Sequence, residues 1–330
     1  MDVPMDVMDV LAPADDAAQP VLVEIVRSGF VEGVHRGRLV LLNADGSVAL
    51  EVGDVRQTLL PRSCNKPMQA VGMLEAGLDL EAELLAIAAG SHQAQAFHIE
   101  AVRKILAEAG LGEDALHTPP ARPGNERALI EFYRRGGQDA PIYYNCSGKH
   151  AAMLSVSARN GWPTASYLDP AHPVQQACRA AIERLSGEPV AAEAVDGCGA
   201  PLYGFSLLGL ARAVRNCVTA EPGTHERRVA DAMRAHPEYV AGDETLDTAA
   251  MRAVPGLLAK TGAESVYVAA LADGAAVAFK IDDGAKRAQP VVLAEALRRL
   301  DVPAAAVAGF GRVPLFGGGR PVGELRAVFG

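Results

Sequence analysis

The placement of β-forming residues at both ends of a long helical middle is the feature that most restricts how this chain folds. Residues 21–27, 38–43 and 47–52 near one end, and 265–271 and 275–281 near the other, are rich in β-branched and apolar residues. An Asp-Gly dipeptide, typical of a hairpin turn, separates the second range from the third and the fourth from the fifth. We therefore expect an α+β fold in which the terminal strands form one antiparallel sheet.

The middle of the chain has the apolar spacing of amphipathic helices. The clearest series follows Pro173, a residue that fits the first turn of a helix. This pattern predicts an all-helical lobe over about 63–257. The lobe is inserted between sheet segments at about 20–62 and 258–330, within a single domain of residues 20–330.

Composition and charge narrow the class of partner. The 40 acidic residues outnumber the 31 basic ones, and the net charge of −9 opposes binding to a nucleic acid backbone. No uninterrupted apolar run reaches the ~18 residues that a membrane span needs. Residues 1–19 are acidic and lack the positive region of a signal peptide. We expect a cytoplasmic protein with a disordered leader over 1–19, and the odd number of five cysteines argues against a disulfide framework.

The first chemical motif is a Ser-x-x-Lys pair, Ser63 and Lys66, just before an apolar helical stretch. At this spacing both side chains share one face of the first helical turn, where Pro67 is tolerated. A serine hydroxyl needs a neighbouring base to act as a nucleophile, and a lysine whose pKa is lowered by burial supplies one. The same pair is also compatible with a capping serine and a surface lysine.

A Lys260-Thr261-Gly262 sequence stands directly before the strand expected at 265–271. A Ser-x-x-Lys pair combined with Lys-Thr-Gly is found in serine β-lactamases and penicillin-binding proteins. Their Ser-Asp-Asn element is absent from this sequence. Ser91-His92-Gln93 and Ser147-Gly148-Lys149 are the candidates for its place, although Ser91 and His92 also fit an exposed turn after a helix.

Two cysteines, Cys146 and Cys198, lie in glycine-flanked turns beside ionisable residues. Thiolates combined with nitrogen or oxygen ligands suit zinc. Two cysteines far apart in a sequence are also commonly small buried core residues, and the pattern alone leaves both interpretations open. The other three cysteines fall at apolar helix positions and are expected in the core: Cys64, Cys178 and Cys217.

From about residue 20 to 326 the chain resembles the class 3, rhizobial-type L-asparaginases (asparaginase II), which share the serine β-lactamase-like fold that is also glutaminase-like. The resemblance is carried, in this order, by EIVRSGFVEGVHRG, PRSCNKPMQA, AAGSHQ, YYNCSGKHAAML, VDGCGAPLYGFSL, AKTGAE and VGELR. It implies hydrolysis of L-asparagine to L-aspartate and ammonia by a homodimer. Two departures are a missing arginine near Thr245 and glycines in the tail LFGGGRPVGEL where an asparagine is expected.

The resemblance also implies two Ser–Lys tandems, which fall here on Ser63 with Lys66 and on Ser91 with Lys260. It further implies one zinc ion per chain, bound by two cysteines and a lysine: Cys146, Lys149 and Cys198.

We expect acyl transfer in which Ser63 attacks the side-chain amide carbon of asparagine. Lys66 is the general base, kept partly neutral by burial and by Lys260, and Ser91 relays a proton between Lys260 and the leaving ammonia. Backbone amides near Ser63 are expected to stabilise the oxyanion.

For the substrate, Arg62 or Arg27 is expected to bind the α-carboxylate. Asp196 is expected to bind the α-ammonium or to orient Lys149. The resemblance favours two histidines, His92 and His150, as residues that line the pocket.

Three alternatives stay open. Glutaminase activity is the closest, because one methylene provides only ~1–3 kcal/mol of discrimination. A penicillin-interacting serine acylase would use Ser63, Lys66 and Lys260, although the missing Ser-Asp-Asn element speaks against it. A non-catalytic zinc-binding module would keep the fold but release no ammonia from asparagine.

Overall fold

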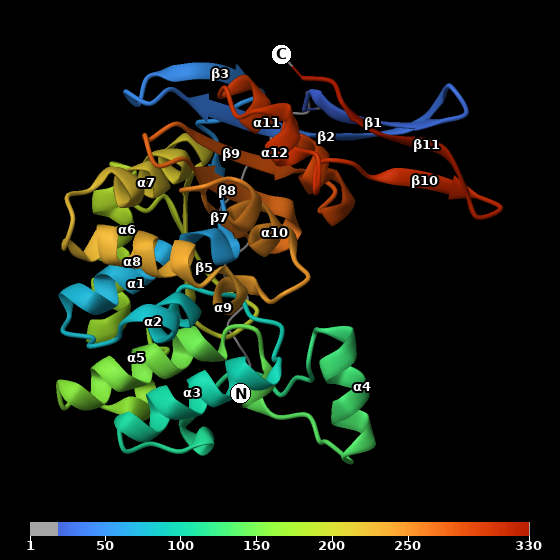
Figure 1. Cartoon of the computed structure of the whole chain (residues 1–330). Coiled ribbons are helices and arrows are strands. Elements are labelled where there is room, and N and C mark those ends of the chain that lie inside the picture. The colour runs from blue at the N-terminus through green and yellow to red at the C-terminus, as the bar shows by residue number, and fades with distance from the viewer. Residues whose placement is uncertain (1–18, 330) are drawn as a thin grey trace, which may run out of the picture.

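The computed structural model of the protein describes residues 19–329, so the expected leader lies outside the described residues except for Gln19. Strands from both ends of the chain form one eight-stranded antiparallel sheet, at the top of Figure 1. Its members are β1 (Val21–Arg27), β2 (Phe30–Leu42), β3 (Val48–Val52), β7 (Leu258–Thr261), β8 (Val266–Ala270), β9 (Ala276–Ile281), β10 (Pro314–Gly317) and β11 (Arg320–Ala327). The order is β10-β11-β1-β2-β9-β8-β7, with β3 paired to β2. The expected α+β class is confirmed.

Both expected hairpins are present. Gly46 lies between β2 and β3 and Gly274 between β8 and β9, with φ values of 86° and 98° that favour glycine. Every residue of β8 is buried, which requires cover on both faces of the sheet. That cover includes α7 (Leu207–Thr219), which packs against β2, β8 and β9, and α11 (Gln289–Arg299), which packs against β1, β9 and β11.

Helices between the two groups of strands build the lobe below the sheet. They are α1 (Lys66–Glu75), α2 (Ala82–Ala88), α3 (Ala96–Glu108), α4 (Glu126–Arg134), α5 (Ser147–Arg159), α6 (Pro173–Ser186), α8 (His225–Ala235), α9 (Pro237–Ala241) and α10 (Leu246–Ala253), while α12 (Ala304–Val307) follows α11. Short 3₁₀ turns are η1 (Arg62–Asn65), η2 (Glu113–Ala115), η3 (Pro141–Tyr143), η4 (Thr164–Ser166), η5 (Ala263–Ser265) and η6 (Lys286–Ala288). Among residues 19–329, no helix is both long and apolar enough for a membrane span.

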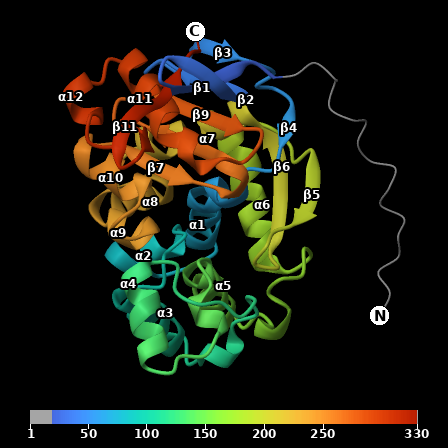
Figure 2. The same ribbon diagram turned by 90° about the vertical axis from the view of Figure 1, so that its right-hand side faces the viewer.

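The first helix of the lobe, α1, is central to the molecule. Every residue from Lys66 to Leu74 is buried, as expected of a helix that neighbours surround on all sides. It packs against α5, α6, α7 and α8, and η1, which directly precedes it, packs against β7 and β8. Figure 2 shows α1 between the sheet and the lower helices α3 and α5. The Ser-x-x-Lys pair therefore lies where the lobe meets the sheet.

Two features differ from the expectation. The lobe is not wholly helical, because β4 (Thr58–Leu59), β6 (Pro201–Ser206) and β5 (Ala192–Val195) form a separate three-stranded sheet in that order. These strands are short, and β6 carries a proline and a glycine, so the sequence gives little strand signal there.

The second difference is that β2 begins at Phe30 rather than near residue 38, and pairs there with β1 in an arm that projects from the body (Figure 1). Solvent reaches both faces of the outer arm, and Phe30 is 72% exposed and Phe316, in β10, 58% exposed. Polar residues and glycines in this stretch of β2 hide its strand character.

Gly37 lies where β2 leaves the arm and pairs with β9. A Cβ at this position would overlap the backbone oxygen of Lys280, so the two strands would have to separate. We predict that Gly37→Ala lowers the free energy of unfolding by about 1–3 kcal/mol in urea unfolding. Gly309→Ala is the matched control, because its Cβ would meet no atom within 4 Å, and it should change stability by less than ~0.5 kcal/mol. Equal stability of the two variants would contradict this close approach.

Candidate active site

Two buried lysine amines meet at the hydroxyl of Ser91. Lys66, the first residue of α1, is 1% exposed, and Lys260, in β7, is 0% exposed. The Nζ atom of Lys66 lies 2.9 Å from Ser91 Oγ, and that of Lys260 lies 3.0 Å from the same oxygen. Lys66 also donates to the carbonyl of Gly90, and Lys260 donates to the carbonyl of Thr261 at 2.7 Å. The fold thus brings three of the four predicted catalytic residues into direct contact.

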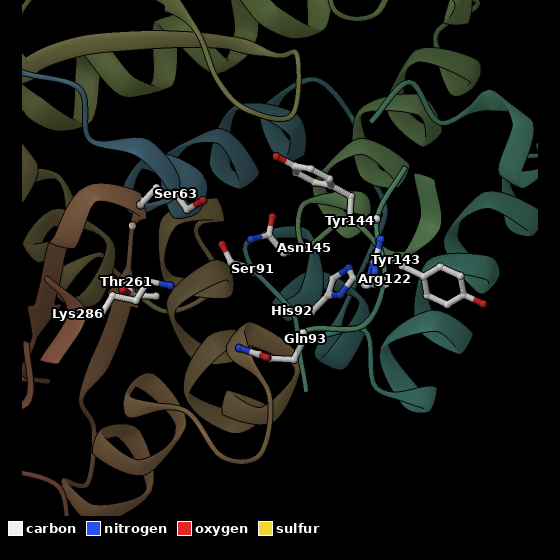
Figure 3. A pocket seen from close by; sticks show the side chains of 14 residues that line it. Ser63, Ser91, His92, Gln93, Arg122, Tyr143, Tyr144, Asn145, Thr261 and Lys286 are labelled. Atoms are coloured by element: carbon white, nitrogen blue, oxygen red, sulfur yellow. The ribbon is translucent and has the colours of Figure 1, made fainter. Parts of the chain in front are cut away.

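The fourth predicted residue, Ser63, opens onto the same cavity as Ser91 but is not part of this hydrogen-bonded set. Within residues 19–329, no hydrogen bond joins Ser63 to Lys66 or Lys260. The amine of Lys66 is bonded to Ser91, so the two lysines share one serine. The cavity has a volume of about 390 Å³. Figure 3 shows Ser63, Ser91 and Asn145 around this space, each from a different segment of the chain.

Three of the segments near the cavity contain a residue other than glycine in the left-handed region. Arg62 (φ 51°) precedes Ser63, Ala94 (φ 53°) follows the loop of Ser91, and Glu264 (φ 55°) follows β7. For residues other than glycine this conformation costs roughly 1–3 kcal/mol and persists only where the surroundings enforce it. Such strain is common where a fold holds side chains for chemistry.

Close packing holds η1 against the end of β7. A Cβ on Gly262 would lie 2.9 Å from the carbonyl oxygen of Pro61 and 3.1 Å from the sulfur of Cys64. The thiol of Cys64 donates to the carbonyl of Lys260 at 3.2 Å. The glycine of the Lys-Thr-Gly motif therefore lets the backbone of β7 approach the turn that carries Ser63.

The environment of Lys260 favours a neutral amine. Burial lowers the pKa of Lys260 to about 8, while the carboxylate of Asp247 opposes this shift and the charge of Lys66 adds to it. Desolvation disfavours the ammonium form because the protein interior solvates charge poorly. An amine that loses its proton near pH 8 can accept a proton from a hydroxyl under physiological conditions.

A second polar cluster surrounds Cys146 and Cys198. Their sulfur atoms and a carboxylate oxygen of Asp196 all lie within 4.8 Å of one another, and Lys149 Nζ is 3.3 Å from Cys198 Sγ. Cys146 stands directly before α5, and Cys198 lies in the turn between β5 and β6. All three predicted zinc ligands are thus together, and Asp196 joins them as a donor.

The charges of this cluster suit a metal ion. A hydrogen bond with Cys198 holds the pKa of Cys146 well below its usual range, despite burial. Burial lowers the pKa of Lys149, but the two cysteines and Asp196 outweigh it and raise the pKa above its ordinary value. Two sulfurs and one carboxylate are donors of the kind that zinc binds, and the amine of Lys149 would bring their number to the four of a tetrahedral site. The residues present therefore fit a zinc ion, although Lys149 must lose a proton to bind it.

An ion pair links this cluster to the turn that carries Ser63. Arg62 Nε donates to Asp196 Oδ1 at 2.7 Å. Burial raises the pKa of Asp196, but Lys149 and Arg62 outweigh it and hold the pKa below its usual range. Neither Arg62 nor Asp196 lines the cavity itself. The other arginine candidate, Arg27, lies in β1 and pairs with Glu32 on the exposed arm, away from the cavity.

The two predicted pocket histidines have different positions. His92 lines the cavity, contacts Ser147 Oγ through Nε2 at 2.8 Å, and has a pKa well below its usual range because it is buried. His150 does not line the cavity: it is fully buried, and its Nδ1 contacts Tyr167 Oη at 2.8 Å. The pocket position expected for His150 is therefore not found, because α5 directs this side chain into the core.

Several residues around the cavity were not singled out from the sequence. Gln93, Tyr144 and Asn145 belong to segments whose motifs were recognised, so their positions in AAGSHQ and YYNCSGKHAAML were an available signal. Two cationic residues, Arg122 and Lys286, carried no signal. Arg122 is paired with Asp139 at 2.7 Å, whereas Lys286 is an exposed residue at the start of η6.

The chain is similar to several solved structures. One is a β-lactamase, Mb2281c from Mycobacterium bovis, with 12% identity over 81% of this chain and 95% of that chain and a TM-score of 0.43. The native form of Mglu has 14% identity over 87% of this chain and 70% of that chain, with a TM-score of 0.45. A covalent complex of the Bacillus subtilis glutaminase YbgJ has 10% identity over 84% of this chain and 92% of that chain, with a TM-score of 0.38. These likenesses are distant and assign no role to any residue here.

Sequence comparison is more specific. No curated protein matches the chain. The family model described as L-asparaginase II matches residues 23–327, which includes most of β1, every element from β2 to β11 and all the residues of the site described above. Because the match extends over nearly the whole chain, the protein belongs to the L-asparaginase II family.

Proposed function

We propose that the protein hydrolyses L-asparagine to L-aspartate and ammonia through an acyl-enzyme on a serine. The observation that carries this proposal is the contact of Lys66 and Lys260 with one serine hydroxyl, Ser91, at a cavity in a chain of the L-asparaginase II family. Membership of this family supports an amidase that acts on a small molecule. The proposal includes a single cytoplasmic domain that works as a homodimer, as the resemblance implies.

In the proposed reaction, Ser63 Oγ attacks the side-chain amide carbon of asparagine, and Lys66 takes its proton. Ser91 relays a proton between Lys260 and the departing ammonia, a role that its two lysine contacts support. Lys260 must be neutral to receive, through Ser91, the proton that Lys66 took from Ser63, and it returns this proton to the ammonia as the C–N bond breaks. Water then attacks the acyl-enzyme, and aspartate leaves. Lys66 must turn from Ser91 toward Ser63 during the first step, and both oxygens border the same cavity.

Ser91 is a second candidate for the nucleophile. Both amines are within hydrogen-bonding distance of its hydroxyl, whereas no such bond to Ser63 exists in the described part of the chain. A hydroxyl next to an amine that becomes neutral near pH 8 is activated for attack.

Recognition of the amino acid requires charges that face its carboxylate and ammonium. Arg62 does not line the cavity but directly precedes Ser63, which does. We propose that it keeps its Nε bond to Asp196 and turns its remaining guanidinium donors toward the α-carboxylate when the substrate binds. Lys286 lines the cavity and is an additional cation for this group. Asp196 is proposed for the α-ammonium, and His92, kept neutral by burial, shapes the wall of the cavity.

We also propose that Cys146, Lys149 and Cys198 bind one zinc ion, with Asp196 beside them. When bound, the ion supplies positive charge that favours a polar group of the substrate near the cavity. Lys149 has to release a proton first, and its raised pKa makes zinc binding weaker as the pH falls.

The substrate is tested by ammonia release from asparagine and from glutamine. We expect a higher kcat/KM for asparagine, because the acyl chain is one methylene shorter and the expected discrimination is ~1–3 kcal/mol. A reversed preference would identify a glutaminase, and release from neither amide would exclude the proposed function. Hydrolysis of a chromogenic cephalosporin, with no ammonia release from asparagine or glutamine, would favour the penicillin-interacting alternative.

The nucleophile is tested by labelling with a diazoketone analogue of asparagine, followed by peptide mass mapping. We predict a covalent adduct on Ser63, and a loss of more than about a thousandfold in kcat for Ser63→Ala with an unchanged circular dichroism spectrum. Ser91→Ala should still be labelled on Ser63 but turn over slowly, because the relay is lost. An adduct on Ser91 in the unmodified protein would reverse the two roles.

The pKa of Lys260 predicts the pH dependence. The neutral amine predominates above a pKa of about 8 and the ammonium below it, so kcat/KM should rise with pH and level off above about pH 8. Lys260→Arg should remove this rise and lose at least about a hundredfold in rate, because arginine stays protonated. Lys66→Arg should be nearly inactive for the same reason. A near-normal rate in either arginine variant would rule out a proton-transfer role for that lysine.

Zinc binding is tested by metal analysis of protein purified without an affinity tag. We predict about one zinc per chain, and a sharp loss of zinc in Cys198→Ser. Cys217→Ser is the matched control, since this cysteine is equally buried but lies in α7, outside the cluster, and its zinc content should not change. Equal zinc in the two variants would exclude Cys198 as a ligand.

A further inference from the structure

Asp247 is a buried carboxylate for which the proposed reaction has no role. It is 1% exposed and lies in the first turn of α10, whose N-terminal dipole favours a negative charge. Its Oδ2 accepts a hydrogen bond from the backbone N–H of Thr261 at 2.9 Å. Its Oδ1 has no hydrogen-bond partner in the described part of the chain. Burying a carboxylate with one unpaired oxygen is costly, so its presence calls for a compensating function.

The position of Asp247 connects it to the catalytic lysine. Thr261 follows Lys260 in β7, so the hydrogen bond from Asp247 fixes the backbone directly beside the lysine. Tyr267, the cross-strand partner of Thr261, is also fully buried, and its Oη has no hydrogen-bond partner among residues 19–329. Burial and the nearby Asp247 carboxylate raise the pKa of Tyr267 well above its usual value.

Four ionisable groups surround Lys260 from the elements packed around it. Lys66 comes from α1, Cys64 from η1, Cys146 from the residue before α5, and Asp247 from α10. Asp247 is the carboxylate among them. Its negative charge acts on the amine without a direct ion pair, because its bonded oxygen, Oδ2, accepts from the backbone of β7.

We propose that Asp247 is a positioning residue for Lys260. Asp247 fixes the backbone of β7 at Thr261, and its buried negative charge sets how readily the Lys260 amine binds a proton. The proposal rests on the proposed function only in assigning Lys260 to the reaction. Anchoring keeps the amine within reach of Ser91. The charge has an independent effect, since it favours the ammonium form and so opposes the effect of burial.

The sign of this effect gives a distinctive test. Asp247 is the largest of the effects that oppose burial and Lys66, so removing its negative charge should lower the pKa of Lys260 below about 8. Asp247→Asn keeps an oxygen that accepts the N–H of Thr261 and removes the charge. We expect the rise of kcat/KM to move to lower pH by about one pH unit, so that the variant reaches its plateau nearer neutral pH. A side chain that only supports the fold would lower the rate without moving this midpoint.

A direct titration makes the test independent of activity. The chain has six lysines, so ¹³Cε-lysine NMR can follow each amine, with Lys260→Arg identifying the signal of Lys260. The Lys260 signal should titrate near pH 8 in the unmodified protein and at lower pH in Asp247→Asn. Asp243→Asn is the matched control, because Asp243 precedes the same helix but is exposed, and its midpoint should equal that of the unmodified protein.

The outcomes separate the two proposals. If the unmodified protein releases no ammonia but the Lys260 signal shifts as expected, the proposed function fails and the role of Asp247 stands. If the signal and the rate midpoint do not move in Asp247→Asn, the role of Asp247 is overturned. If the asparagine side chain of Asp247→Asn does not fit the site, Asp247→Ser replaces it as a smaller neutral hydrogen-bond acceptor. The midpoint of the Lys260 titration is then measured in that variant. Loss of folding in both neutral variants would assign Asp247 to fold stability and would also overturn the proposal.

Discussion

The contact of two buried amines with one serine hydroxyl is the interaction on which the rest of the molecule depends. Two ammonium groups this close repel each other, and burial penalises both charges, so the arrangement exists only where a rigid surrounding enforces it. That surrounding is the junction of the two halves: Lys66 begins α1, which is buried up to Leu74, Lys260 lies in β7, and Ser91 is in the loop after α2. The left-handed residues near the cavity and the close approach at Gly262 belong to the same enforced junction.

The parts of the fold that could be predicted from the sequence have strong local causes. The two Asp-Gly turns and the largely apolar strands β8 and β9 signal hairpins because glycine permits positive φ and both faces of the sheet are covered. The arm was missed because β2 carries polar residues and glycines where solvent reaches both faces, so alternation with a buried face is absent. The short strands β4, β5 and β6 were missed for a related reason: a strand of a few residues is too short to show an alternation of apolar and polar side chains.

The sequence predicted which residues belong to the site better than it predicted which of their side chains contact one another. Ser-x-x-Lys suggests that Lys66 serves Ser63, yet the amine is bonded to Ser91, which comes from a loop whose place no local pattern reveals. The cysteine motifs indicated two donors and the family resemblance a third, while the position of Asp196 beside them depends on how β5 and β6 are joined. The bond from Arg62 to Asp196 links this cluster to the turn that carries Ser63, and the sequence gives no sign of this pairing.

The pairing of both chain ends in one sheet has a consequence for the order in which the molecule is completed on the ribosome. β2 needs β9 as its neighbour, and β1 needs β11, which are among the last strands to be synthesised. Helices depend on local contacts and form early, whereas these strand pairs close very long loops and form late. The lobe can therefore assemble around α1 while Lys66 still lacks its second amine. An abortive product that ends before β7 would hold the serines and the cysteine cluster but not Lys260. Proton transfer between the two lysines thus becomes possible only after β7 has been synthesised.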